Sequence, residues 1–537
     1  MELRGLATEA QTRLAAGTNP AVTAAEPLNG PTLKEPAKGV STPLEPSTEA
    51  VRALPADFVQ RHRVLPLGIS NGVIRVASAA PADAQVLDDI RLLTGLEVEE
   101  IQASAEQIQE RIAASYQVTV EKMIEELGPE RSPNGEGKNL HDIEVMANEP
   151  TVVNLVNLII STALGEGASD IHFVPFEDSL QLRYRIDGLL QEQPPPPKQL
   201  HAALVSRIKI MADMNIAERF APQDGHIQIH HRGMRVDIRV GTMPTIYGES
   251  LVMRLLEKNS KALTYDELGL DPQRAAVMAL LVEKPHGLFL ATGPTGSGKT
   301  TTLYSVLRSI YTPELKILTI EDPVEYELPG VAQIPVRPSR NFNFADGLRS
   351  ILRQDPDVIM VGEIRDFETA EIAIRAALTG HQVFSTLHTN DSTGAVTRLV
   401  DMGVEAFLIS SALEGVLAQR LVRRICAACR AESTPSGAIR EQIATLSGRA
   451  VEGVFYHGRG CEECRGTGYR GRVGIFELLP ITQELRELIV QRRSNTELKT
   501  AARKSMTTMH EDALKKAAAG VTSLEEILRV SSGDSVE

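Results

Sequence analysis

A glycine-rich loop between an apolar run and a helical stretch constrains this fold more than any other feature. The loop Gly293-Pro-Thr-Gly-Ser-Gly-Lys299-Thr300 follows the apolar segment 287–292. Glycines let successive backbone N–H groups turn inward around an anion, and the helix that follows adds partial positive charge. In this pattern the lysine reaches the β- and γ-phosphates of a nucleotide, and the threonine hydroxyl can bind Mg²⁺. We expect contacts to phosphates and magnesium from Gly293, Pro294, Thr295, Gly296, Ser297, Gly298, Lys299, Thr300 and Thr301.

Acidic residues follow two further apolar runs. From about 260 to 480 such runs alternate with helical stretches, which predicts an α/β fold with a mostly parallel sheet. Glu321 and Glu325 follow one run, and Glu363 follows another. Because the carboxyl ends of parallel strands border the ligand crevice, we expect both clusters beside the phosphates. A solvated strand end is the alternative for either cluster taken alone.

Two histidines, His381 and His388, bracket the strand-like segment 383–387 next to Gly380. A lone histidine is more often a core residue with satisfied hydrogen bonds. A pair in this position favours a role at the γ-phosphate.

Four cysteines form two CxxC pairs, Cys426 with Cys429 and Cys461 with Cys464. Each pair presents two thiolates on one turn, so together they complete a tetrahedral zinc site without an open coordination position. The spacing between the pairs leaves room for an inserted helix at about 434–449. Independent buried thiols or a redox pair are the alternative.

The chain predicts several domains, because 537 residues are too many for one compact core. Its first 50 residues are rich in proline and predict a disordered arm, with a partner-docking tail as the alternative. Asn71-Gly72 predicts a hairpin, and the alternation over 180–186 predicts a half-buried strand. Ser523 and Glu526 predict a capping box for the last helix. The predicted divisions are 1–50 (arm), 51–127 (amino-terminal module), 128–142 (linker), 143–258 (second domain), 259–425 (nucleotide-binding domain), 426–472 (tetracysteine subdomain) and 473–537 (helical region).

The composition of the chain argues against some classes of function. The net charge of −14 and the absence of Trp argue against a nucleic-acid-binding surface, which needs clustered cations and stacking rings. The amino terminus lacks the pattern of a secretory signal, and the most apolar stretch, 152–164, is too short to span a membrane. We therefore expect a cytosolic protein that reaches any membrane through a partner.

Together these segments resemble the GspE/PilB family, the secretion ATPases of type II secretion and type IV pilus assembly, over about 51–537. The loop 293–300 matches the family's Walker A motif, and the other motor motifs match at 317–327 (Asp box), 355–366 (atypical Walker B) and 380–391 (His box). The segments 168–172, 185–188 and 222–225 resemble the domain that precedes the motor.

The resemblance implies a RecA-like motor core, a preceding α+β (PAS-like) domain, and Mg²⁺-dependent ATP hydrolysis. It also implies a cytoplasmic homohexamer, held at the inner membrane by a platform protein and by a docking domain that binds module 51–127. The implied catalytic residues are Glu325, Glu321, Glu363, His381, His388, Arg239 and Arg254.

The implied roles differ. Glu325 would orient the attacking water, with Glu321 as the alternative, and Glu363 would act on Mg²⁺ through water. The two arginines would contact phosphates as their domain closes on the motor. Either Arg470 or Arg472 would reach a neighbouring subunit's phosphates.

Three other functions remain open at this stage. The segment 407–423 slightly favours type II secretion over type IV pilus assembly. A nucleic-acid motor is the second class, because RecA-like cores also drive helicases. A nucleotide-dependent scaffold is the third, and the intact acidic residues argue against it.

Overall fold

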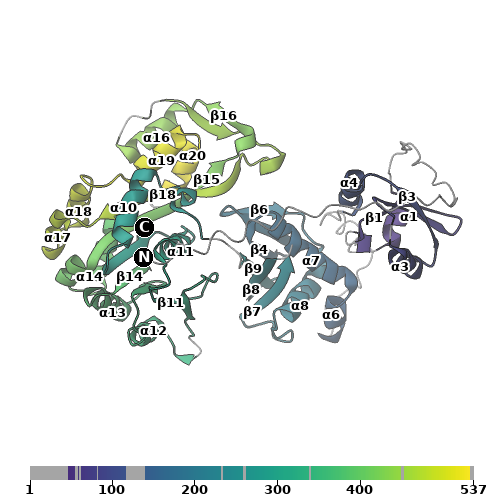
Figure 1. Ribbon diagram of the computed structural model, residues 1–537, viewed down its shortest axis with the longest axis horizontal. Coiled ribbons are helices and arrows are strands. Elements are labelled where there is room, and N and C mark those ends of the chain that lie inside the picture. Colours follow the sequence, from purple (N-terminus) through teal and green to yellow (C-terminus); the bar gives the residue numbers. More distant parts are fainter. Residues whose placement is uncertain are drawn as a thin grey trace, which may run out of the picture. The chain divides into compact units, whose positions relative to one another are not determined.

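The computed structural model describes residues 46–54, 58–59, 62–81, 83–116, 140–231, 234–257, 262–337, 340–448, 451 and 453–532. The chain divides into two compact units, residues 1–118 and 119–537 (Figure 1). Residues 1–45 of the predicted arm and 128–139 of the predicted linker lie outside the described ranges. Helices α1 (Thr48–Ala53) and α6 (Leu140–Ala147) begin within the last residues of those two segments.

The first unit is built on a three-stranded sheet of order β1-β2-β3. Strands β1 and β2 are antiparallel, and β2 and β3 are parallel. Asn71 and Gly72 join the first two strands with φ of 52° and 78°, which confirms the predicted hairpin turn. The elements are β1 (Val64–Ser70), β2 (Val73–Ser78), α3 (Ala84–Thr94), β3 (Glu97–Gln102) and α4 (Ala105–Tyr116).

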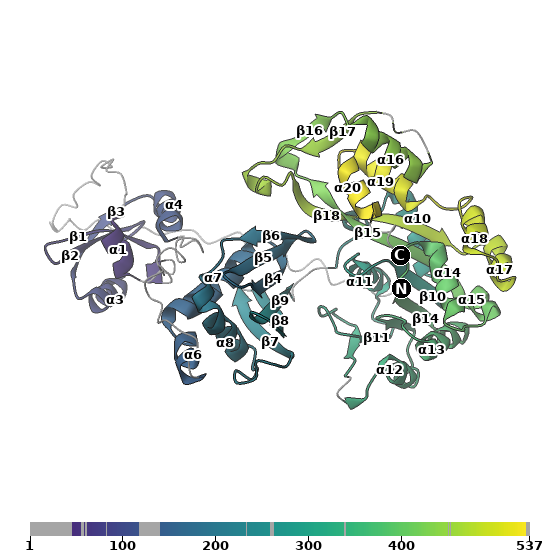
Figure 2. The same cartoon turned by 180° about the vertical axis from the view of Figure 1, so that it is seen from behind.

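Residues 140–257 form an antiparallel six-stranded sheet of order β6-β5-β4-β9-β8-β7. Helices α7 and α8 pack against this sheet around one shared apolar core (Figure 2). Burial alternates strictly along β5, as the sequence predicts for 180–186. The elements are α7 (Pro150–Gly165), β4 (Ala168–Pro175), β5 (Leu180–Ile186), β6 (Leu189–Gln193), η2 (Lys198–Leu200), α8 (His201–Met211), β7 (Gln223–His231), β8 (Met234–Thr245) and β9 (Gly248–Glu257).

Residues 262–532 contain a seven-stranded sheet of order β12-β11-β13-β14-β10-β15-β18. Neighbours from β12 to β15 are parallel, and β18 is antiparallel to β15. The strands are β10 (Gly287–Thr292), β11 (Ile317–Glu321), β12 (Ala332–Pro335), β13 (Val358–Val361), β14 (Gln382–Leu387), β15 (Leu413–Ile425) and β18 (Tyr469–Pro480). The predicted strand 287–292 is thus confirmed, close to the middle of a mostly parallel sheet.

Helices surround this sheet, and a small two-stranded lobe interrupts it between β15 and β18. The helices are α9 (Tyr265–Leu268), α10 (Pro272–Val282), α11 (Lys299–Ile310), α12 (Phe344–Ile351), α13 (Phe367–Leu378), α14 (Ser392–Asp401), α15 (Ala406–Ala412), α17 (Gln483–Val490), α18 (Asn495–Ala502), α19 (Met509–Ala518) and α20 (Leu524–Ser532). The lobe contains η4 (Ala427–Cys429), β16 (Arg430–Ser433), α16 (Gly437–Ser447), β17 (Phe455–Gly458) and η5 (Glu462–Cys464). Helix α16 confirms the helix predicted within 434–449.

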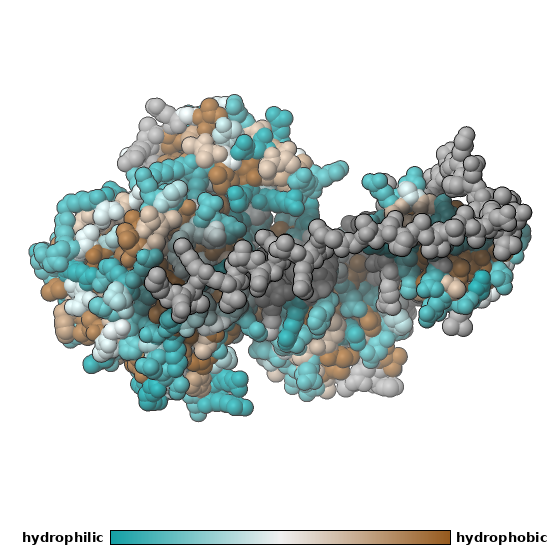
Figure 3. Space-filling model, in the orientation of Figure 1, coloured by the Kyte–Doolittle hydropathy of each residue, from teal (hydrophilic) through white to brown (hydrophobic). Residues whose placement is uncertain are grey.

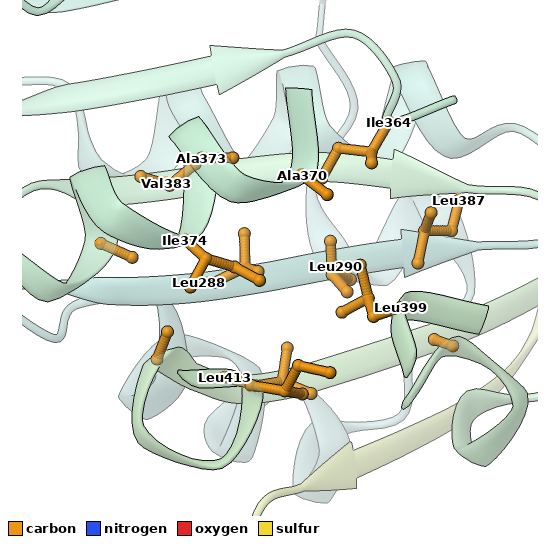
Figure 4. Packing of buried hydrophobic residues seen from close by; sticks show 14 of the residues in the cluster. Leu288, Leu290, Ile364, Ala370, Ala373, Ile374, Val383, Leu387, Leu399 and Leu413 are labelled. Carbon is orange, nitrogen blue, oxygen red and sulfur yellow. The ribbon is translucent and has the colours of Figure 1, made fainter. Parts of the chain in front are cut away.

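Buried apolar side chains hold β10, the strand that leads into the glycine-rich loop, in the middle of the sheet. Leu288 and Leu290 of β10 are fully buried, and Figure 4 shows them beside Val383 of β14 and Ile374 of α13. These side chains come from strands and helices far apart in the sequence. Burying one leucine or isoleucine stabilises a fold by about 1.5–3 kcal/mol, so this layer holds β10 firmly in register.

The visible surface in Figure 3 is mostly hydrophilic, with hydrophobic residues in small separate patches. Within the described ranges, no helix combines the length and the apolar character that crossing a membrane requires.

Candidate nucleotide site and metal centre

The glycine-rich loop lies at the carboxyl end of β10 and leads directly into α11. Gly293 and Gly298 have φ of 149° and 89°, in the region that favours glycine. A Cβ atom on Gly293 would lie 2.5 Å from both the Gln419 carbonyl oxygen and the Ser297 Oγ. The tight loop and the helix start therefore form the backbone cradle that a phosphate group fits.

Lys299 lies inside this loop. Its Nζ donates hydrogen bonds to the carbonyl oxygens of Gly293 (2.7 Å) and Pro294 (3.0 Å). Burial lowers the pKa of Lys299 to about 8; the charge of Glu363 opposes this fall and that of Arg420 adds to it. A buried cation on the inner side of an amide cradle is the expected partner of a nucleotide's terminal phosphates.

Glu363 follows β13, and its two carboxylate oxygens contact Arg365 and His388. Arg365 donates to its Oε1 at 2.6 Å, and the His388 Nε2 lies 3.3 Å from its Oε2. Burial pushes the pKa of Glu363 upward, but the hydrogen bond and charge of Arg365, with those of His388, leave it below its usual value. Glu363 is therefore an ionised carboxylate at neutral pH, as a magnesium site requires.

Glu321, the last residue of β11, is only 2% exposed. Its Oε1 accepts hydrogen bonds from Thr319 Oγ1 (2.5 Å) and Gln333 Nε2 (3.2 Å), and its Oε2 accepts one from the Tyr304 hydroxyl. Burial raises the pKa of Glu321, and these three hydrogen bonds oppose the rise. Both oxygens of Glu321 are thus occupied inside the protein.

Glu325 has a different environment, on the loop that follows β11. It is half-buried, and its backbone N–H donates to the Tyr304 hydroxyl at 3.3 Å. Of the two acidic residues, Glu325 has the partly exposed side chain that a role at a substrate requires.

His381 and His388 lie at opposite ends of β14. The seven steps between them span about 23 Å at about 3.3 Å per residue. The Gly287 N–H donates to the His381 carbonyl (3.2 Å), which places His381 at the amino end of β10, away from the glycine-rich loop. Within one chain, the expectation that both histidines reach the γ-phosphate is therefore corrected: only His388 follows the strand at its loop end.

Arg239 and Arg254 face each other on neighbouring strands of the 140–257 sheet. Arg254 Nε lies 2.9 Å from Oδ1 of Asp170, which is buried on β4. Both arginines thus belong to the domain from which sequence resemblance expects them to act, and their contact with phosphates stays a prediction.

The four cysteines converge in the lobe between β15 and β18. Their sulfurs all lie within 4.8 Å of one another. The Sγ atoms are 3.8 Å apart in Cys426 and Cys461, 3.7 Å apart in Cys429 and Cys464, and 3.6 Å apart in Cys461 and Cys464. Four sulfurs about 2.3 Å from one zinc ion would be about 3.8 Å apart, whereas a disulfide needs about 2.05 Å. The four thiols therefore fit a tetrahedral metal ion and not a disulfide pair.

The second cysteine pair also has backbone donors. The N–H groups of Cys461 and Gly468 both point at Cys464 Sγ, each at 3.2 Å. A Cβ on Gly468 would lie 2.5 Å from the Gly458 carbonyl oxygen, so this turn needs glycine. N–H donors stabilise a thiolate, which is the form that binds metal.

Arg470 and Arg472 follow this turn. Arg470 pairs with Glu463 at 3.1 Å, and the Arg472 Nε lies 3.8 Å from Asp187 Oδ1. Both are partly exposed, with side-chain exposures of 66% and 42%. A reach into a neighbouring subunit stays a prediction for either residue.

Sequence reasoning missed several residues that shape the site. Tyr304 and Gln333 bind Glu321, Arg365 binds Glu363, and the Gln419 side chain donates to the Ser297 carbonyl at 2.6 Å. Arg365 follows Glu363 by two residues, so its charge was a visible signal. The other three contacts join distant segments, for which spacing gives no signal.

The comparisons with known proteins agree with this geometry. The family model "Type II/IV secretion system protein" matches residues 146–529, and the "MshEN domain" model matches residues 41–121. The type IV pilus assembly ATPase PilB of Myxococcus xanthus is 42% identical over 490 residues, covering 89% of this chain and 86% of the relative. The type II secretion system ATPase E of Vibrio cholerae is 42% identical over 491 residues, covering 90% and 97%.

A solved structure supports the fold. The Legionella pneumophila ATPase DotB is similar with a TM-score of 0.52 at 24% identity, covering 72% of this chain and 98% of that one. At this identity the likeness supports the RecA-like motor fold alone. With the family match over 146–529, this chain belongs to the type II/IV secretion system protein family.

Proposed function

We propose that this chain hydrolyses ATP to drive type II protein secretion, through assembly of a pseudopilus and export across the outer membrane. The observation that carries the proposal is the cradle of Gly293–Lys299 with the ionised Glu363 beside it, in a chain of the secretion family. A cradle with a buried cation binds phosphates, and carboxylates near it supply what hydrolysis adds.

Each catalytic residue has a proposed role. Glu325 orients the attacking water, because its side chain is partly exposed while both oxygens of Glu321 are occupied. Glu363 acts on Mg²⁺ through water, and His388 holds Glu363 in place. Arg239 and Arg254 neutralise charge on the phosphates when their PAS-like domain closes on the motor. Thr300 and Glu363 are the residues that would hold Mg²⁺, which would supply positive charge to offset that of the phosphates.

The four cysteines would hold a structural zinc ion. All four coordination positions come from protein, so the ion stabilises the lobe and leaves no position for a substrate.

We further propose a homohexamer in the cytoplasm that associates with the inner membrane through partners. Module 51–127 would dock on the cytoplasmic part of the secretion complex, and the motor would act on an inner-membrane platform protein. The match of residues 41–121 to the MshEN domain supports a separate module there.

Assembly of type IV pili is the second candidate. The pilus assembly relative and the type II secretion relative are both 42% identical to this chain. Deleting the gene separates the two: loss of secreted enzymes with normal surface pili supports type II secretion. Loss of pili with normal secretion supports pilus assembly.

The first test of the activity is the ATP hydrolysis rate against protein concentration, with and without single-stranded DNA. Lys299→Ala is the blank, because it removes the buried cation. We expect a rate that rises faster than linearly, is indifferent to DNA and is lost in the variant. A linear rate that DNA strongly stimulates would contradict a secretion motor and favour a nucleic-acid motor.

A further inference from the structure

Tyr304 lies in the first half of α11, four residues beyond Thr300, and its side chain is fully buried. Its hydroxyl donates to Glu321 Oε2 and accepts from the backbone N–H of Glu325 (3.3 Å) and from Gln333 Nε2 (3.2 Å). A phenol has one proton and two lone pairs, so this hydroxyl uses its full hydrogen-bonding capacity. Helix α11, the end of β11 with the loop after it, and strand β12 therefore meet at one oxygen atom.

Gln333 of β12 also contacts the loop that joins β11 to β12. Its Oε1 accepts from the Leu328 N–H (2.7 Å). Its Nε2 shares two protons among three acceptors, namely the Tyr326 carbonyl (3.1 Å), the Tyr304 hydroxyl (3.2 Å) and Glu321 Oε1 (3.2 Å). The loop from β11 to β12 is thus fixed to Tyr304 at residue 325 and to Gln333 at residues 326 and 328. The Tyr326 ring also packs edge-on against the Tyr304 ring, with centroids 4.6 Å apart.

We propose that Tyr304, Glu321 and Gln333 are positioning residues that set the place of Glu325 relative to the nucleotide loop. This inference rests on the proposed role of Glu325 in hydrolysis. Tyr304 is on the helix that begins in the phosphate cradle, so its hydroxyl connects the cradle to the backbone of residue 325 directly. Glu321 serves as the buried acceptor that directs the tyrosine proton away from the Glu325 N–H.

The chemistry of the cluster explains why it contains an acid. An acceptor for the Tyr304 proton is required, because both lone pairs of that oxygen already accept N–H groups. Glu321 provides this acceptor, while Thr319 and Gln333 donate to its other oxygen. A tyrosine that only filled the core would need one hydrogen-bond partner. The Tyr304 hydroxyl instead has three, and each of them belongs to the loop from β11 to β12 or to one of the two strands that this loop joins.

The test is the steady-state kinetics of Tyr304→Phe, which removes one oxygen and keeps the ring. We expect kcat to fall by about 100-fold, the size of effect that a misplacement of about 1 Å produces. The KM for ATP should stay within about twofold, because the cradle itself is unchanged. Tyr326→Phe is the matched control, since it removes a hydroxyl outside the cluster and keeps the backbone carbonyl that Gln333 binds; it should behave as the native chain.

A double-variant cycle separates positioning from general damage. If Tyr304 acts through Glu325, adding Tyr304→Phe to Glu325→Gln should lower kcat by less than twofold further. Multiplicative losses would overturn the proposal, as would a native kcat in Tyr304→Phe. If Tyr304→Phe does not fold, Gln333→Met takes its place in the same cycle, with the same expected result.

Different results would refute the ATPase function and the positioning role of Tyr304. A native chain without ATPase activity, or a fully active Lys299→Ala variant, would refute the proposed function. A native chain that hydrolyses ATP beside a Tyr304→Phe variant of equal kcat would refute only the positioning role.

Discussion

At the scale of single residues, Glu321 and Glu325 of the 317–327 segment lie in different environments. Glu321 accepts three hydrogen bonds in the interior, and Glu325 is half-buried on a loop. Glu321→Ala leaves buried donors without a partner, so we expect a loss of about 3 kcal/mol in the free energy of unfolding. Glu325→Gln should keep that stability and lower kcat by about 100-fold or more. Denaturant unfolding and ATPase assays of both variants check this, and the reverse pattern would exchange the two roles.

We expect Lys299 to make nucleotide binding depend on pH. Its pKa is lowered to about 8, so the unliganded side chain is charged below that pH and loses its charge as the pH rises through it. We expect ADP affinity to decrease above about pH 8, and binding near that pH to take up protons because phosphate favours the charged lysine. Calorimetry in buffers of different ionisation enthalpy measures the uptake. Equal heats in all buffers at pH 8 would contradict a lowered pKa.

The histidine pair shows what residue patterns could and could not predict. The glycine-rich loop and its flanking strand were predictable, because their chemistry is local in the sequence. His381 was assigned to the phosphates by its spacing from His388, although a strand of six residues separates them. The strand's length could have excluded His381. The partners of Glu321 could not be predicted, because they come from α11 and β12 and meet only in the folded sheet.

At the scale of elements, we expect the cysteine lobe to depend on a bound metal ion for its stability. Its four sulfurs lie within 4.8 Å of one another, and a metal ion bound to all four would add its coordination energy to the stability of the lobe. Elemental analysis should find about one zinc per chain, and Cys426→Ser should lower the melting temperature without changing the KM for ATP. Ser433→Ala, on β16 of the same lobe, is the control. Far less than one zinc per folded chain would refute the site.

Local sequence patterns predicted individual helices and turns better than they predicted which strands pair in the sheet. The hairpin at Asn71-Gly72 was predictable from its turn residues, and helix α16 from the spacing between the two cysteine pairs. At the last helix, the Glu526 N–H donates to Ser523 Oγ (3.3 Å), as predicted, but the Glu526 carboxylate pairs with Arg423 and Arg529. The antiparallel pairing of β18 with β15 has no local signal, because it joins strands separated by the whole cysteine lobe.

At the scale of the whole molecule, the chain's first compact unit ends at residue 118, before the nucleotide site begins. We therefore expect a chain lacking residues 1–127 to keep its basal ATPase rate and to lose docking on the cytoplasmic domain of the membrane complex. Full-length Lys299→Ala is the matched control, because it should dock without hydrolysing ATP. Co-purification and ATPase assays on both proteins measure the two properties, and normal docking by the shortened chain would refute the module's role.

One continuous strand joins the two ends of the motor. β15 pairs with the nucleotide strand β10 at Ala418 and ends at Ile425, directly before Cys426, and β18 returns along it. The register between the two strands is regular from Gly415 to Arg423 and shifts once, between Arg423 and Ile425. We therefore expect this strand pair to act as a lever that carries a force on the four-cysteine lobe to β10, the strand that leads into the glycine-rich loop.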